Sequence, residues 1–229
     1  MDLGAHLTAG LELRERELIA IVGGGGKTTL MRALALHGAR SGRSVLAGTT
    51  TKVYATQAHG LDHFLHRERA GNKLIGVDPQ EVDRVFESKT YDWIVVEADG
   101  SRGKVVKAPG HHEPPIPSRS THVVAVVGAD GLDRVIEDVA HRPMLVAAVC
   151  GCGPYERFTV PRACLLLTSD RGLRKHVPAD ARFTVAITRV GERQRALADA
   201  LVGALQSHGV PSVLLPLLPT DHDPIGPDR

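Results

Sequence analysis

Apolar positions along this chain fall into short continuous runs that alternate with segments of helical spacing. The runs occupy residues 18–22, 43–48, 92–97, 121–127, 183–188 and 213–218, and they predict six strands. The third run holds Trp93-Ile94-Val95-Val96 without interruption, which is typical of a strand buried on both faces. Helical spacing follows the first and fifth runs. This order predicts an α/β fold, with a mostly parallel sheet flanked by helices.

The segment between the second and third runs gives a weaker pattern. It predicts a helix over 61–69, a short strand over 73–77 and a further helix that begins at Pro79. Three histidines at spacings of four and three residues would share one face of the first helix, and a solvated stripe is favoured over a binding role for them. These are His59, His63 and His66. Residues 160–167 fit a strand or a helix, and a proline in the first turn favours the helix.

Composition predicts a single domain over residues 1–229, with a frayed tail at 219–229 that is rich in Pro and Asp. With 28 Lys and Arg against 26 Asp and Glu, the formal net charge is +2, which favours neither a nucleic acid nor a membrane as a partner. No run approaches the roughly 20 apolar residues of a membrane helix, and no leader pattern opens the sequence. Three cysteines make no disulfide framework. We therefore expect a cytoplasmic protein.

A glycine-rich loop follows the first strand and opens the first helix. Its sequence is Gly23-Gly24-Gly25-Gly26-Lys27-Thr28-Thr29. Glycines let consecutive backbone N–H groups approach one polyphosphate, which would then lie at a helix N-terminus. In a Walker A loop the lysine reaches the β and γ phosphate oxygens, and the next threonine binds Mg²⁺. Ile21 replaces the first glycine of the full motif, but the shorter form G-G-x-G-K-T is intact. The loop predicts nucleotide binding, with a flexible hairpin as the simpler alternative.

Hydroxyl groups follow the second strand, in the run Thr49-Thr50-Thr51-Lys52. Open α/β sheets bind ligands at the carboxyl ends of their strands, so this run is a candidate to contact the γ-phosphate, the metal or an acceptor substrate. A helix N-cap explains the threonines equally well.

Two carboxylates end the third strand, in the segment Glu97-Ala98-Asp99-Gly100-Ser101-Arg102. Residues two apart in an extended chain point to one side, so Glu97 and Asp99 are expected to lie together. One acid would anchor Mg²⁺ and the other would orient water or an acceptor hydroxyl, and either residue fits either role. Arg102 is expected to face the transferred phosphoryl group or the acceptor. A solvated turn is the alternative.

A basic, proline-stiffened loop leads from these acids toward the fourth strand. It contains Lys104, Lys107 and Pro109, followed by His111-His112-Glu113-Pro114-Pro115-Ile116-Pro117. Adjacent histidines rarely bind one ion, so an anion-binding or substrate-orienting loop is favoured over a zinc site, and simple routing of the chain is also open.

Two later motifs each allow a functional and a structural interpretation. Arg142, in His141-Arg142-Pro143, could supply a cation to the developing phosphoryl charge or form a structural ion pair. Cys150-Gly151-Cys152 offers soft sulfur ligands for selenium or a metal, but C-x-C alone is weak evidence.

Together these motifs resemble the YqeC family. The resemblance rests on the glycine loop, T-T-T-K, E-A-D-G-S-R-G, E-P-P-I-P and H-R-P, and it covers nearly the whole chain. It implies a P-loop NTPase-like fold, nucleotide binding and a role in selenium-cofactor assembly for molybdenum hydroxylases. Met144 stands where the family tends to have an acid. Thr188-Arg189-Val190-Gly191 occupies the place of a guanine-reading N-K-x-D motif without its Asn or Asp, so guanine selectivity is not favoured.

The sequence thus predicts an Mg²⁺-dependent NTPase or phosphotransferase that acts in the maturation of a selenium-dependent molybdenum hydroxylase. ATP is slightly preferred over GTP as the nucleotide. The expected partners are a selenium or molybdenum-cofactor intermediate, a client hydroxylase or other maturation proteins, and a second copy of the chain. A small-molecule kinase and a nucleotide-gated carrier or insertase with slow hydrolysis are the alternatives.

Overall fold

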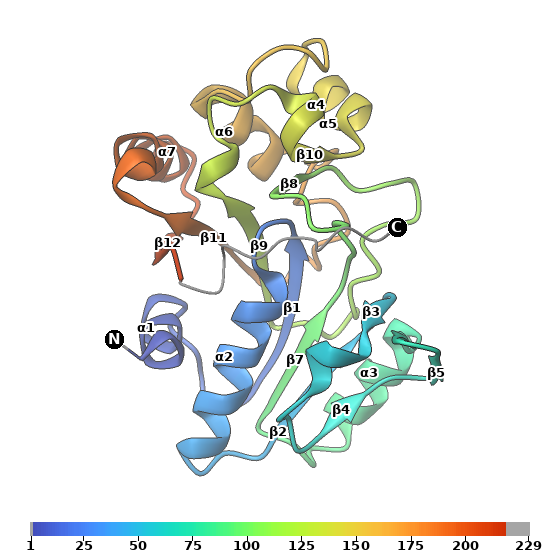
Figure 1. The fold of residues 1–229 in the computed structure, drawn as a ribbon. Helices are drawn as coiled ribbons and strands as arrows, with labels where there is room; N and C mark the ends of the chain where they lie inside the picture. The colour runs from blue at the N-terminus through green and yellow to red at the C-terminus, as the bar shows by residue number, and fades with distance from the viewer. Residues whose placement is uncertain (1, 219–229) are drawn as a thin grey trace.

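The computed structural model describes residues 2–218, and its centre is a seven-stranded sheet (Figure 1). The strand order is β12-β11-β9-β1-β7-β2-β4, and every neighbouring pair runs parallel. The predicted α/β class is therefore confirmed. The predicted tail at 219–229 lies outside the described residues.

The described elements have the following bounds. The strands of the large sheet are β1 (Glu17–Gly23), β2 (Val45–Thr49), β4 (Phe64–Leu65), β7 (Trp93–Glu97), β9 (His122–Gly128), β11 (Arg182–Val190) and β12 (Ser212–Pro216). The smaller strands are β3 (Val53–Tyr54), β5 (Glu68–Ala70), β6 (Lys73–Ile75), β8 (Val106–Lys107) and β10 (Ala140–His141). The α-helices are α1 (Leu3–Gly10), α2 (Lys27–Arg40), α3 (Pro79–Glu87), α4 (Ile136–Val139), α5 (Pro143–Cys150), α6 (Val160–Thr168) and α7 (Arg195–Ser207). Short 3₁₀ turns are Ala55–Ala58, Ala129–Gly131 and Glu192–Gln194.

Two apolar clusters cover the two faces of the sheet. All seven residues of β1 are buried, and alternate side chains enter opposite clusters, with Leu18 in one and Ile19 in the other. Helices α1 and α2 pack on the Ile19 face, whereas residues of α3, α4, α5, α6 and α7 pack on the Leu18 face. This burial on both faces explains why the central strands appear in the sequence as uninterrupted apolar runs.

The six predicted strands are confirmed, as are a strand at 73–75, the helix from Pro79 and the helix over 160–168. The predicted helix over 61–69 is wrong. That stretch contains β4, which pairs with β2 at the sheet edge, and β5, which pairs antiparallel with β6. These short strands are held by backbone hydrogen bonds, and the side chains of β5 are exposed. Their sequences therefore show no alternation of buried and exposed positions that would predict strands.

Candidate nucleotide site

The glycine loop leaves the end of β1 in the middle of the sheet and enters α2. Gly23, Gly25 and Gly26 have positive φ angles of 97°, 80° and 120°, which other residues rarely adopt. A Cβ atom on Gly23 would lie 2.2 Å from the carbonyl oxygen of Val126. The loop is also tied to its neighbours, since Gly24 N donates to the same oxygen at 2.9 Å. Its shape is therefore fixed by packing as well as by composition.

The Lys27 side chain is buried and folds back on the loop. Its ammonium group donates to Gly23 O at 2.8 Å and to Ser101 Oγ at 3.2 Å. It also lies 3.6 Å from Glu97 Oε1 and 3.5 Å from Asp99 Oδ1. The structure thus brings the loop lysine together with both predicted acids, and Ser101 is a contact that the sequence reasoning did not assign.

Each acid also contacts the loop directly. Thr28 Oγ1 donates to Glu97 Oε2 at 2.8 Å, and Gly23 N donates to Asp99 Oδ2 at 3.1 Å. Burial raises the pKa of Glu97, and this outweighs the opposing effects of Lys27 and the Thr28 hydrogen bond. Asp99 is 1% exposed, and its Oδ1 has no hydrogen-bond partner.

The threonines after β2 are used differently. Thr49 Oγ1 lies 3.1 Å from both Thr51 O and Glu97 O, and Thr50 Oγ1 donates to Pro115 O at 2.8 Å. These two hydroxyls therefore tie the end of β2 to the end of β7 and to the proline-rich loop. Thr51 Oγ1 is beside Gly100, 3.7 Å from the position of a Cβ atom on that glycine.

A row of alternating charges, buried at Asp99 and Lys107 and half-buried at Glu113 and Arg142, extends from the acids to the start of α5. Lys107 Nζ lies 3.2 Å from Asp99 Oδ2 and 2.9 Å from Glu113 Oε2, and it donates to Gly100 O at 2.6 Å. Glu113 in turn accepts two hydrogen bonds from the Arg142 guanidinium. These hydrogen bonds from Arg142 and Lys107 hold the pKa of Glu113 well below its usual range against the effect of burial. The structural ion pair that the sequence left open for Arg142 is present.

The remaining candidate residues differ in exposure. Arg102 is exposed, has a φ of 49°, and is close enough to His141 to lower the pKa of that imidazole, although burial is the larger cause. Burial also raises the pKa of Cys150 to about 12 and raises that of Cys152. Among residues 2–218, no group of three or more His, Cys, Asp and Glu side chains is placed to hold a metal ion.

Fold and site together define a class of protein. A central parallel strand leads into a glycine loop, a buried lysine and a helix, while the adjacent strand ends in two acids that face the lysine. This is the arrangement of a P-loop protein with an α/β fold.

Comparison with known sequences gives the family. The model of the YqeC protein family matches residues 19–144. A protein of Escherichia coli (strain K12), described as "Uncharacterized protein YqeC", is 31% identical over 237 residues, which cover 94% of this chain and 90% of the relative. The chain belongs to the YqeC family.

Two solved structures resemble the chain more distantly. One is the signal recognition particle 54 kDa protein of Aeropyrum pernix K1, in complex with GDP, which is 18% identical with a TM-score of 0.47. The match covers 89% of this chain and 42% of that protein's chain. The hydrogenase maturation factor HypB of Archaeoglobus fulgidus is 13% identical with a TM-score of 0.40, and the match covers 94% of this chain and 88% of HypB. Within residues 2–218, no helix is both long and apolar enough to cross a membrane.

Proposed function

We propose that this protein binds a nucleoside triphosphate with Mg²⁺ in the Gly23-to-Gly26 loop and transfers or hydrolyses its terminal phosphoryl group. The position of Lys27 carries this proposal. Lys27 is 4% exposed, and its ammonium group contacts a carbonyl of the loop and two carboxylates. It therefore already lies beside the loop. Exchange of the carboxylates for phosphate oxygens would place its charge on the β and γ phosphates.

The chemistry of the neighbouring oxygen atoms fits Mg²⁺. Asp99 Oδ1 is buried without a hydrogen bond, which is costly unless a ligand satisfies it. Thr28 Oγ1 and Glu97 Oε2 lie beside each other at 2.8 Å. Mg²⁺ prefers oxygen ligands and takes few of them from protein, with the rest from phosphates and water. Thr28, Glu97 and Asp99 would hold the ion, which would neutralise charge on the phosphate oxygens.

The chain's own groups then have separate tasks. Backbone N–H groups of Gly23, Gly24, Gly25 and Gly26, with Thr29 at the start of α2, would surround the phosphates. Glu97 and Asp99, beside the ion, would also orient water or an acceptor hydroxyl. Arg102 at the rim would contact the acceptor side. Thr49, Thr50 and Arg142 would support the site indirectly, because their polar groups already bind protein atoms.

Membership of the YqeC family supports a biological setting for this activity. The resemblance to this family implies a role in the maturation of selenium-dependent molybdenum hydroxylases, and we propose that nucleotide turnover here drives assembly or insertion of the selenium-containing cofactor. A client hydroxylase and a cofactor intermediate are the proposed partners, and a homodimer is the proposed assembly. ATP is the proposed nucleotide.

Calorimetric titration of Mg²⁺-ATP and Mg²⁺-GTP tests nucleotide binding. We expect micromolar binding of one nucleotide to the wild type and loss of binding in Lys27→Ala. Lys89→Ala is the matched control, because Lys89 is exposed in the turn after α3, and it should bind as the wild type does. Absence of nucleotide binding to the folded wild type would contradict the proposal.

Turnover assays separate the proposed function from its alternatives. An NTPase releases phosphate without an acceptor, whereas a small-molecule kinase needs one. A carrier with slow hydrolysis would instead be stimulated by a client hydroxylase. Formation of the nucleoside diphosphate by wild type, measured together with phosphate release and with and without each addition, therefore assigns the class.

A further inference from the structure

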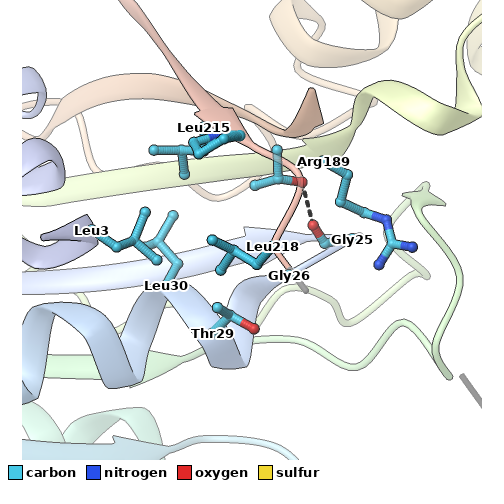
Figure 2. A pocket seen from close by; sticks show the side chains of 10 residues that line it. Leu3, Gly25, Gly26, Thr29, Leu30, Arg189, Leu215 and Leu218 are labelled. Carbon is cyan, nitrogen blue, oxygen red and sulfur yellow. Dashed lines mark hydrogen bonds between the residues drawn. The ribbon is translucent and has the colours of Figure 1, made fainter. Parts of the chain in front are cut away.

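A narrow slot lies beside the glycine loop, at the carboxyl ends of β11 and β12. Figure 2 shows its apolar side chains, which come from segments distant in the sequence. Leu3 belongs to α1, Leu30 to α2, and Leu215 and Leu218 to β12 and the residues after it. Gly25 and Gly26 of the loop form the adjoining wall.

We propose that this slot receives the adenine base of the nucleotide whose phosphates lie in the glycine loop. This inference rests on the proposed function and adds where the base binds and why adenine fits there. The slot and the loop share Gly25, Gly26 and Thr29, so a ligand in the loop extends directly into the slot. Its apolar walls suit a flat purine ring, since ligand sites bury rings against apolar side chains and use few polar groups.

Two of the polar side chains that line the slot, Thr188 and Arg189, are already engaged. Thr188 Oγ1 donates to Gly25 O, which fixes the loop against the end of β11. Arg189 Nε donates to Asp130 Oδ2 at 2.8 Å, and Figure 2 shows its guanidinium extending away from the leucines. The other oxygen of Asp130 has no hydrogen-bond partner and is packed against Gly128, where an added Cβ atom would lie 2.6 Å from it. Asp130 is therefore turned toward its own backbone and toward Arg189.

This lining favours adenine over guanine. Guanine carries an N1–H and a 2-amino group that need acceptors, and the described residues that line the slot include no Asp or Glu. Each buried donor without a partner weakens binding by about fivefold or more, so the two donor groups of guanine together weaken it by at least tenfold. Adenine has one amino group and no N1–H, so it leaves fewer donors without partners in an apolar slot.

Base binding also requires two walls to move. The free volume of the slot is about 20 Å³, which holds little more than one water molecule. The side chains of Leu3 and Leu218, from the first turn of α1 and the residues after β12, are the walls nearest the two chain ends. We expect them to separate when the base enters, while Leu30 on α2 stays in place because it is 1% exposed in the core.

Titrations with Mg²⁺-ATP, Mg²⁺-GTP and Mg²⁺-tripolyphosphate separate the base from the phosphates. We expect ATP to bind at least tenfold more tightly than GTP and tripolyphosphate. Leu3→Trp should fill the slot and reduce ATP affinity to that of tripolyphosphate, with tripolyphosphate binding unchanged. Leu145→Trp is the matched control, because Leu145 is 40% exposed on α5, and it should leave all three affinities unchanged.

The outcomes distinguish this inference from the proposed function. If tripolyphosphate binds, its binding is lost in Lys27→Ala, and neither base increases the affinity, the assignment of the slot as a base site is wrong and the assignment of the loop as a phosphate site stands. GTP binding as tight as ATP binding would overturn the adenine assignment. No binding of any polyphosphate would overturn both. Nuclear Overhauser contacts from adenine H2 or H8 to leucine methyl groups at Leu3 and Leu215 would support the slot without any substitution, and contacts to methyls elsewhere would overturn it.

Discussion

Lys107→Met should destabilise the protein by about 3 kcal/mol, because Lys107 is a fully buried cation between two carboxylates. Removal of one partner of a buried ion pair costs about 3–5 kcal/mol, since the other charge stays buried without compensation. Here Asp99 keeps Lys27 and the Gly23 N–H, and Glu113 keeps Arg142. We therefore expect the low end of that range, which corresponds to a melting temperature lower by about 6–12 °C in a chain of this size.

Urea unfolding measures this cost directly. The chain has one tryptophan, Trp93, which is 1% exposed in β7, so its fluorescence reports loss of the central sheet. Arg119→Met is the matched control, because Arg119 pairs with Glu87 on the surface at 62% side-chain exposure and should cost no more than about 1 kcal/mol. Equal costs for the two variants, or a cost below about 1 kcal/mol for Lys107→Met, would refute the reasoning. Addition of Asp99→Asn to Lys107→Met should cost less than the two changes summed, since the variants share one interaction.

Three further outcomes follow from the structure. Asp99→Asn should weaken Mg²⁺-dependent nucleotide affinity much more than Cys152→Ser does. Calorimetry measures these affinities, and equal affinity of Asp99→Asn and wild type would contradict the assignment of Asp99 as a metal ligand. Burial lowers the pKa of His122 to about 3, with a smaller effect of Arg182, so the unfolded state takes up a proton below pH about 6.5 while the folded state does not. As the pH falls from 6.5 to 3, the free energy of unfolding of wild type should therefore decrease by up to about 1.4 kcal/mol per pH unit relative to that of His122→Gln. Urea unfolding at several pH values measures this difference, and parallel pH profiles for the two proteins would rule it out. Because the pKa of Cys150 is raised to about 12, its alkylation by iodoacetamide at pH 8 should be at least 100-fold slower in the native than in the unfolded chain. Mass spectrometry measures both rates, and equal rates would show that Cys150 is not a buried thiol.

The sheet could be predicted from the sequence because its strands are buried on both faces. Such strands consist of continuous apolar residues, and the glycine loop after β1 marks the edge where their carboxyl ends meet. The same logic placed Glu97 and Asp99 beside Lys27, since β7 is the direct neighbour of β1. Because these two strands are neighbours in the sheet, Lys27 and Glu97 are in contact although seventy positions separate them in the sequence.

Some elements carried a usable pattern that the sequence analysis did not include. Helix α1 has Leu3, Leu7 and Leu11 at intervals of four residues, and Asp2 caps it by accepting from Gly4 N at 2.9 Å. The stretch 61–69 is the opposite case. Its histidines suggested a helix face, but the backbone pairs with β2 and β6 instead, and edge pairing imposes no particular side-chain order.

The charge row could not be predicted because its pairs join separate loops. Arg142 reaches Glu113 because β10 lies against β8, in the register that sets His141 opposite Lys107. Once assembled, the row has a consequence for the ligand. Its cations are Lys27, Lys107 and Arg142, and its carboxylates are Glu97, Asp99 and Glu113, so the formal charges balance before any nucleotide arrives. A triphosphate that enters without a cation would add uncompensated negative charge beside two buried acids. We therefore expect nucleotide binding to require Mg²⁺, because the ion both satisfies Asp99 Oδ1 and releases Lys27 from the acids to the phosphates.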